Sequence, residues 1–207
     1  MSFTERRTSP TRREVLTYAA LGGLGSASYF IICHSASGAA PVLMPAWVPF
    51  FPSLAIPYLL QLVVSFILVF LLGDKALRRA CMSAYFASYA VTCLVWLSVP
   101  TIMVRPPLPE GWWNWPYRTM VGLDLPVSIL PAGHILMPVI VCWAFALERP
   151  RSLWWLVPCE LLGTVAIVTT WQHRPVDVAI GAVNAVAFGL LFGMGGWRKR
   201  RGRGSSR

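Results

Sequence analysis

The segment Thr169–Gly181, TTWQHRPVDVAIG, places ionisable residues between two long apolar runs. His173 and Asp177 are four residues apart. On a helix this spacing brings the carboxylate within reach of the imidazole, where it could fix the ring tautomer and raise its basicity. Pro175 suits the first position of a helix, which puts Asp177 in the first turn, where an aspartate can also serve only as a cap. The pair therefore has the composition of a nucleophile with its orienting carboxylate.

Two further residues could act with this pair. His134, in the sequence PAGH, adds a second imidazole, and Arg105 adds a guanidinium that can hold an oxyanion through two parallel hydrogen bonds. Together they supply the parts of phosphoryl transfer: a nucleophile with its orienter, a general acid and a cationic cradle. Zinc is the rival interpretation, because two histidines and an aspartate can bind it, but His-x-x-x-Asp is a weak metal signature. We expect no metal and no cofactor.

These residues lie in a chain that lacks the polar surface of a soluble protein. Of its 207 residues, 56% are hydrophobic and 13% are charged, whereas soluble domains carry about a quarter charged residues. The apolar residues form blocks near 15–36, 55–73, 80–99, 127–147, 153–171 and 176–196. Each is close to the roughly 20 residues that span a bilayer, and a spanning segment must satisfy its backbone internally. We expect an all-α integral membrane protein with six transmembrane helices.

The positions of the basic residues predict the orientation of these helices. They gather before the first block, between the second and third, between the fourth and fifth, and after the sixth. The main ones are Arg6, Arg7, Arg12, Arg13, Lys75, Arg78, Arg79, Arg149, Arg151 and the basic residues of 198–207. All four groups share one side if every block spans, and basic loops stay in the cytoplasm, so both termini should be cytoplasmic.

The same distribution of basic residues also indicates which partners the protein has and how the chain is divided into domains. The net charge of +10 is explained by topology and by attraction to anionic lipids, so we expect no nucleic acid. The chain divides into a basic tail (1–14), a membrane domain (15–197) and a second basic tail (198–207). We expect Trp112, Trp113, Trp115 and Tyr117, in the 100–126 loop, to form an interfacial aromatic belt.

On this topology the candidate residues share the outer side. Arg105 follows the third block, His134 begins the fourth, and His173 and Asp177 begin the sixth. Ionisable residues at such places are costly in a membrane protein and suggest a site. Two others have milder explanations: His34 is expected to be a tolerated interfacial residue, and Glu160 to be protonated or hydrogen-bonded within the bundle.

Two short stretches resemble a known family. PAGH at 131–134 and QHRPVDVAIG at 172–181 resemble the second and third signature blocks of the type 2 phosphatidic acid phosphatase superfamily. Its membrane members have six helices and a His–His–Asp site. The segment MPAWVPFFPSLAIPYL and the Gln-His pair are more similar to the sphingomyelin synthase and inositol phosphorylceramide synthase branch. The resemblance covers about Pro41 to Gly181. It implies that His173 is the nucleophile forming phosphohistidine, Asp177 its orienter, and His134 the acid that protonates the leaving oxygen.

The chain also departs from the family's pattern. The first block keeps Arg105 before a proline, but the lysine expected seven residues earlier is Ser98. The usual serine of the second block is Ala132, and the Ser-Arg pair expected before the nucleophile is Ala166 and Ile167. Part of the usual phosphate cradle is therefore missing.

These features together predict an enzyme acting on membrane lipids. We expect it to cleave or transfer a lipid-linked phosphate on the extracytoplasmic side of a bacterial plasma membrane, with Gly133 and Arg174 as further candidate phosphate-binding residues. A reduced cradle suits a phosphodiester, which carries one negative charge, better than a monoester, which carries nearly two. This favours head-group transfer onto a lipid or sugar hydroxyl. A lipid phosphate monoester phosphatase is the alternative, and a non-catalytic transporter or scaffold is a further one.

Overall fold

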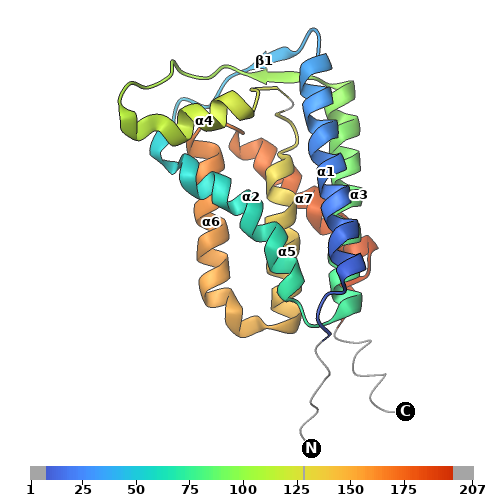
Figure 1. The fold of residues 1–207 in the computed structure, drawn as a ribbon. Coiled ribbons are helices and arrows are strands. Elements are labelled where there is room, and N and C mark those ends of the chain that lie inside the picture. The colour runs from blue at the N-terminus through green and yellow to red at the C-terminus, as the bar shows by residue number, and fades with distance from the viewer. Residues whose placement is uncertain (1–7, 128, 198–207) are drawn as a thin grey trace, which may run out of the picture.

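The computed structural model describes residues 8–127 and 129–197, and these residues are mostly helical (Figure 1). The described part of the chain contains seven α-helices. They are α1 (Arg12–Ser35), α2 (Ala55–Leu68), α3 (Lys75–Ser98), α4 (Trp115–Leu123), α5 (Leu136–Glu148), α6 (Leu153–Thr169) and α7 (Pro175–Leu191). Two short strands, β1 (Ala40–Val42) and β2 (Thr101–Met103), pair in parallel.

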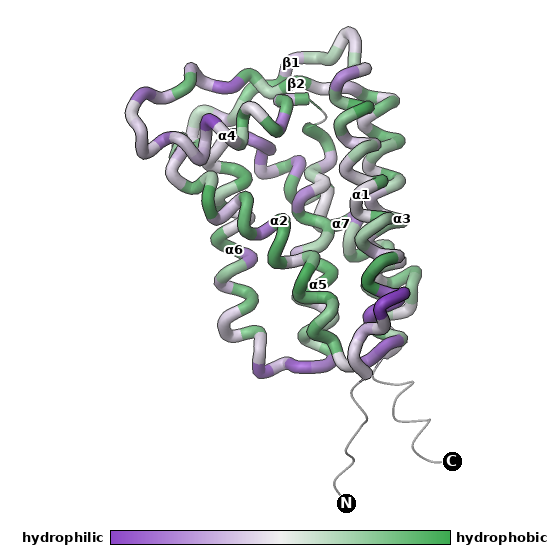
Figure 2. Tube along the Cα trace, in the orientation of Figure 1, coloured by the Kyte–Doolittle hydropathy of each residue, from purple (hydrophilic) through white to green (hydrophobic). Residues whose placement is uncertain are grey.

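Each of the six apolar blocks contains a helix, although in the fourth, 127–147, the α-helix begins only at Leu136. Four of the helical segments could cross a membrane by length and composition. These are Arg12–Ser35, Pro52–Leu71, Lys75–Ser98 and Pro150–Thr169, whereas Gly133–Glu148 and Pro175–Leu191 are apolar but shorter. Large apolar side chains point outward from several helices, among them Leu60, Leu94, Leu161 and Leu190. Figure 2 shows hydrophobic residues along the middle of the bundle and hydrophilic ones towards its ends. Such an apolar exterior indicates a membrane protein.

One end of the bundle gathers the basic connections. The Thr8 amide donates to the Gly73 carbonyl at 3.1 Å, and the buried Arg78 guanidinium donates to the Thr8 carbonyl at 2.8 Å. The Glu148 carboxylate accepts from the Gly73 amide at 2.8 Å. The start of α1, the α2–α3 loop and the α5–α6 loop therefore lie together (Figure 1). The predicted basic residues of 1–7 and 198–207 lie outside the described residues.

The opposite end is built mainly from irregular segments, with α4 lying across it (Figure 1). Tyr117 and Met120 of α4 pack against Tyr58 of α2 and Ile167 of α6. Trp112, Trp113 and Trp115 remain exposed, as an interfacial belt requires. Tyr117 is buried and does not belong to that belt, because it lies on the face of α4 that packs against α2. The expected aromatic belt therefore needs correction at Tyr117.

The core of the bundle is formed by α3, α5 and α7. Leu77, Met82, Ile140, Val141 and Ala185 are fully or almost fully buried in it. The outermost helix is α1, which packs on α3. Only 6% of its most apolar 18-residue stretch is buried. Because His134 lies just before α5 and His173 just before α7, the packing of these core helices determines where both candidate residues lie.

Candidate active site

His134 and His173 meet at the irregular end of the bundle. Their ring centroids are 5.3 Å apart with an interplanar angle of 65°. His134 lies in a short 3-10 turn, Gly133–Ile135, that leads into α5, and His173 lies in the loop between α6 and α7. The structure thus brings together two predicted residues that are 39 positions apart in the sequence.

The PAGH turn is held against α7 by close backbone packing. The Ala132 amide donates to the Asp177 carbonyl at 3.0 Å. A Cβ atom on Gly181 of α7 would lie 2.5 Å from the Ala132 carbonyl oxygen, and one on Gly133 would lie 2.9 Å from the Trp96 ring. Only glycine permits both approaches. These two glycines therefore set the position of His134 relative to α7.

The loop that carries His173 turns sharply after α6. Trp171 adopts a left-handed conformation with φ of 57°, and the Gln172 amide donates back to the Ile167 carbonyl at 3.1 Å. His173 Nδ1 lies 2.6 Å from the Ile129 carbonyl oxygen. Because a carbonyl can only accept, Nδ1 must carry the proton, and in the neutral ring the Nε2 lone pair is then free.

Burial decides the protonation state of this histidine. His173 is 4% exposed. Its burial, with His134 nearby, lowers the pKa of His173 well below the ordinary value of 6.5. The ring is therefore neutral near pH 7, which is the state that a nitrogen nucleophile requires.

The predicted role of Asp177 as the orienter of His173 is wrong in this structure. The Asp177 carboxylate accepts from the Arg174 backbone amide at 2.8 Å, and from Arg174 Nε and Nη2 at 3.0 and 2.8 Å. No hydrogen bond joins it to His173 within the described part of the chain. The reason is that α7 begins at Pro175 with Arg174 as its N-cap. His173 therefore lies before the helix, and Asp177, the third residue of α7, accepts from the backbone amide of the N-cap Arg174 instead.

Arg105 lies beside the histidines, as expected, but it already has partners. It donates through Nη1 to the Asp124 carbonyl at 2.8 Å and through Nη2 to Gln172 Oε1. It also forms an ion pair with the Asp124 carboxylate at 3.8 Å. A small cavity of about 10 Å³ separates these residues from the histidines, which is room for about one water molecule. This space must therefore widen before Arg105 can hold a larger anion there.

The two other predicted phosphate-binding residues take different places. Arg174 is tied to Asp177 and is not among the residues that line the cavities at the histidines. Its predicted phosphate contact is therefore not supported, because its donors satisfy the Asp177 carboxylate. Gly133 lines the larger cavity directly beside His134. His34 lies at the exposed end of α1, with Nδ1 2.8 Å from the Phe30 carbonyl oxygen.

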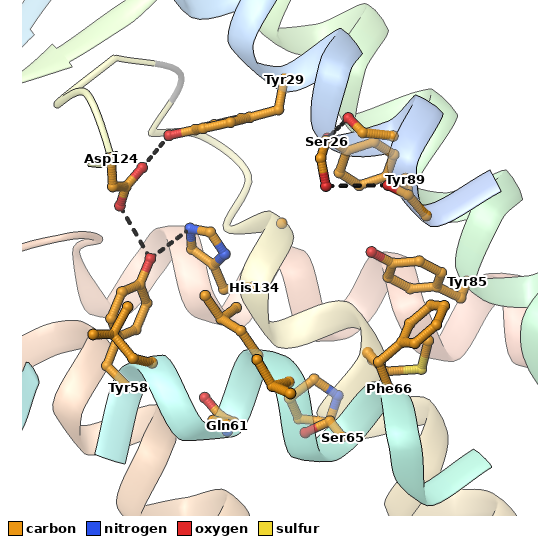
Figure 3. A pocket seen from close by; sticks show the side chains of 18 of the residues that line it. Ser26, Tyr29, Tyr58, Gln61, Ser65, Phe66, Tyr85, Tyr89, Asp124 and His134 are labelled. Carbon is orange, nitrogen blue, oxygen red and sulfur yellow. Dashed lines mark hydrogen bonds between the residues drawn. The ribbon is translucent and has the colours of Figure 1, made fainter. Parts of the chain in front are cut away.

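Three residues that were not expected from the sequence complete the surroundings of His134. Tyr58 Oη lies 3.0 Å from His134 Nε2 and donates to Asp124 Oδ2 at 3.0 Å. Tyr29 donates to the other oxygen of Asp124. Figure 3 shows the continuous chain Tyr29–Asp124–Tyr58–His134. Because the Tyr58 proton points to Asp124, its oxygen can accept from His134 Nε2, so this chain orients the His134 ring.

A cavity of about 580 Å³ opens from His134 into the apolar part of the bundle. Tyr58 and Asp124 line its polar end, and side chains such as Phe66 and Tyr85 line its deeper part (Figure 3). The walls come from α1, α2, α3, α4 and α5. A chamber with a polar end and a long aromatic and aliphatic wall fits an amphiphile.

Glu160 lies close to the cavity residues Gln61 and Ser65. It is hydrogen-bonded within the bundle, which was one of the two expectations for it. Its carboxylate accepts from Ser65 Oγ at 2.8 Å and from Gln61 Nε2 at 2.9 Å. Among residues 8–127 and 129–197, no three His, Cys, Asp or Glu side chains come together in a way that could hold a metal ion.

Comparison with known proteins adds no assignment. No family model matches the sequence, and no curated protein matches it. The resemblance to the type 2 phosphatidic acid phosphatases therefore stays a prediction that rests on short motifs.

Proposed function

We propose that this chain is a membrane enzyme that transfers a lipid-linked phosphate through a phosphohistidine on His173. The observation that carries the proposal is the pair of imidazoles, 5.3 Å apart, of which His134 lines the polar end of a cavity shaped for an amphiphile and both line the small cavity beside Arg105. Each ring has its own fixed partner, the Ile129 carbonyl for His173 and the Tyr58 hydroxyl for His134. Such preorganised, distinct environments are what nucleophile and acid roles need.

The reaction would proceed in two displacements at phosphorus. The lone pair of His173 Nε2 forms the nitrogen–phosphorus bond while the phosphorus–oxygen bond to the first alcohol breaks. The leaving oxygen takes a proton from Nδ1 of His134, which must enter this step protonated on both nitrogens because its Nε2 proton is donated to Tyr58. In the second step a hydroxyl gives its proton back to His134 and attacks phosphorus, and the bond to His173 breaks. Tyr58 and Asp124 hold His134 in place during both steps.

The charges around the histidines favour a phosphodiester donor. Arg105 is the cation that lines the small cavity, and it shares its charge with Asp124. One partly compensated guanidinium suits a substrate with one negative charge better than a monoester with nearly two. We therefore propose transfer of a phosphodiester head group onto a lipid or sugar hydroxyl.

The proposed membrane arrangement has six spans, α1, α2, α3, α5, α6 and α7, with both termini cytoplasmic. It is supported by the arrangement of the elements, because the start of α5 and the α6–α7 loop lie at the end of the bundle opposite the α2–α3 and α5–α6 connections (Figure 1). Basic residues gather around those two connections, and basic loops stay in the cytoplasm. The reaction would then take place at the extracytoplasmic face of the plasma membrane, with membrane lipids as its partners.

The test is to give the purified protein, in detergent, a glycerophospholipid diester labelled in its phosphate. Wild type should form an acid-labile phosphoprotein and release diacylglycerol, and His173→Ala should do neither. Tyr58→Phe removes the hydroxyl that bonds both His134 and Asp124 and should slow turnover about tenfold or more.

The matched control is His34→Ala, which changes an exposed histidine in the last turn of α1 and should retain wild-type turnover. Turnover by His173→Ala at the wild-type rate would overturn the proposal. Rapid release of inorganic phosphate from phosphatidic acid, with the diester untouched, would replace the transferase with a monoester phosphatase.

A further inference from the structure

We propose that a phospholipid enters the site sideways from the membrane, through an opening of the larger cavity between α1 and α2; this inference rests on the proposed function. An opening must be bordered by side chains that both line the cavity and are exposed. Such side chains come from three helices: Ala19, Ser26 and Phe30 of α1, Val63 and Ile67 of α2, and Leu123 of α4. The cavity is therefore open on the side that α1 and α2 border.

The walls that α3 and α5 contribute to this cavity are closed. Among the residues that the structure describes, none that lines the cavity from these two helices is exposed. Trp96 of α3 and Met137 and Pro138 of α5 are buried, and Tyr85 and Tyr89 of α3 are half-buried. A molecule that reaches the cavity must therefore pass between α1 and α2.

The border of this opening is apolar, so it faces lipid and not water. Phe30 is 44% exposed and Val63 is 58% exposed, and both belong to the hydrophobic middle of the bundle (Figure 2). Ser26 is the polar residue of the border, and its hydroxyl donates to the Gly22 carbonyl at 3.1 Å. In a membrane protein, exposed apolar side chains with a satisfied backbone face the hydrocarbon of the bilayer. The opening thus connects the cavity with the interior of the membrane.

Towards the basic end of the bundle, α1 and α2 approach each other. A Cβ atom on Gly22 of α1 would lie 3.4 Å from the Phe66 ring of α2. Beyond it, the ring centroids of Tyr18 and Phe70 are 6.2 Å apart. Val63 precedes Phe66 on α2 and so lies nearer the histidine end. Entry past Val63 therefore leads into the half of the cavity that contains His134.

The length of the cavity matches one leaflet of a bilayer. Its lining residues on α2 run from Tyr58, which contacts His134, to Ile67. This distance of nine positions is about 13.5 Å along a helix axis. The hydrocarbon of one leaflet is about 15 Å thick, half of the roughly 30 Å of the whole core. A lipid with its phosphate at His134 would therefore keep its chains at the depth that they have in the surrounding leaflet.

The polar end of the cavity connects this route to the histidines. Four residues line both the larger cavity and the small cavity beside Arg105 (Figure 3): Tyr29, Trp96, Asp124 and His134. Tyr29 belongs to α1 and donates to Asp124, so a helix that borders the opening also contacts the site. A lipid admitted between α1 and α2 would thus bring its phosphate against the residues that surround Arg105 and His173.

The test is photo-crosslinking of the purified protein in detergent, with photoreactive benzoylphenylalanine in place of Phe30 or of its neighbour Ile31. Both positions are exposed on α1, but Phe30 lines the cavity and Ile31 is not among its lining residues. The probe is a glycerophospholipid diester with an alkyne on one acyl chain, at a low ratio of lipid to detergent. We expect severalfold more lipid to be attached at position 30 than at position 31, because a lipid in a site stays longer than one on the outer surface.

A second pair of variants narrows the opening from the side of α2. Val63→Trp places a large side chain at the border and should lower the labelling of position 30 to that of position 31. Val64→Trp is the matched control, because Val64 is exposed beside Val63 but is not among the residues that line the cavity. Equal labelling of positions 30 and 31, or labelling of position 30 that Val63→Trp leaves unchanged, would overturn the inference. A crosslink from position 30 to a second copy of the chain in place of lipid would also overturn it.

Turnover of the same diester separates failure of this inference from failure of the proposed function. Val63→Trp should lower kcat/KM about tenfold because it overfills the route of entry, and Val64→Trp should keep the wild-type value. Selective labelling of position 30 that Val63→Trp removes would support the opening even if wild type turned over no lipid. Wild-type kcat/KM in Val63→Trp, with its labelling unchanged, would show that lipids enter by another route.

Discussion

At the scale of single residues, His173 obtains its orientation from a backbone carbonyl and its charge state from burial. The sequence correctly predicted that His134 and His173 come together, because both are polar residues at the same ends of apolar segments. It did not predict the partner of either ring. The contact of His173 with the Ile129 carbonyl, and that of His134 with Tyr58, join segments that are far apart in the chain, and no local pattern marks them.

The spacing of Asp177 shows why a local rule failed at this site. A separation of four residues predicts contact only if both residues are on the same helix. Here the helix starts at Pro175, so the spacing crosses the helix boundary and Asp177 caps α7 through Arg174. The sequence also allowed Asp177 to serve only as a helix cap, and this is the role that it has in the structure. Asp124, the carboxylate that accepts from Tyr58, lies in a loop and is not marked by any spacing pattern in the sequence.

The lowered pKa of His173 predicts how stability depends on pH. In the folded protein the pKa of His173 lies well below its ordinary value of 6.5, so the ring stays neutral when the pH falls below 6.5. In the unfolded chain the ring takes up a proton near pH 6.5. The unfolded state therefore binds more protons in this range, and stability is lost as the pH falls below about 6.5. Thermal unfolding in detergent should show a melting temperature that decreases from pH 7.5 to pH 5.5.

The variant that checks this is His173→Asn, whose side-chain amide can still donate to the Ile129 carbonyl but does not titrate. Its melting temperature should decrease less between the same two pH values, and the exposed His34→Asn should keep the wild-type dependence. If wild type and His173→Asn had the same slope, His173 would not be held neutral by burial.

At the scale of elements, the site depends on the contact between the PAGH turn and α7. Each of the six predicted blocks contains a helix, because long apolar runs specify helices in a membrane almost by themselves. The nine-residue α4 and the pairing of β1 with β2 were not predicted. Both are short and are stabilised by residues distant in sequence, as Tyr117 and Met120 of α4 are by α2 and α6.

Gly181 gives a direct test of this contact. In Gly181→Ala the new methyl group would lie 2.5 Å from the Ala132 carbonyl oxygen, so α7 and the PAGH turn must separate and the distance between the two histidines must change. We expect a loss of about 1–3 kcal/mol of stability and a large loss of turnover. Gly23→Ala is the matched control, because nothing lies within 4 Å of a Cβ atom there. Gly181→Ala with wild-type melting temperature and turnover would show that this contact does not position His134.

At the scale of the whole molecule, charge separates the two ends of the bundle. Of the 18 Lys and Arg residues, Arg105, Arg118 and Arg174 lie in segments at the end with the histidines. Arg105 and Arg174 are also paired with aspartates. At the opposite end, the first turns of α3 carry Lys75 and Arg79, and the α5–α6 connection carries Arg149 and Arg151. This asymmetry predicts that the histidine end faces outward, because loops rich in Lys and Arg are retained in the cytoplasm.

Single-cysteine labelling of intact cells tests this orientation. In a background with the five native cysteines replaced, a cysteine at Trp113, exposed beside α4, should react with a membrane-impermeant maleimide added outside. A cysteine at Lys75, at the start of α3, should react only after the cells are permeabilised. Both positions lie at ends of the bundle rather than in its apolar middle, so a difference between them reports sidedness and not burial in lipid. Labelling of position 75 from outside, with position 113 protected, would place the histidines at the cytoplasmic face and require a lipid donor from the inner leaflet.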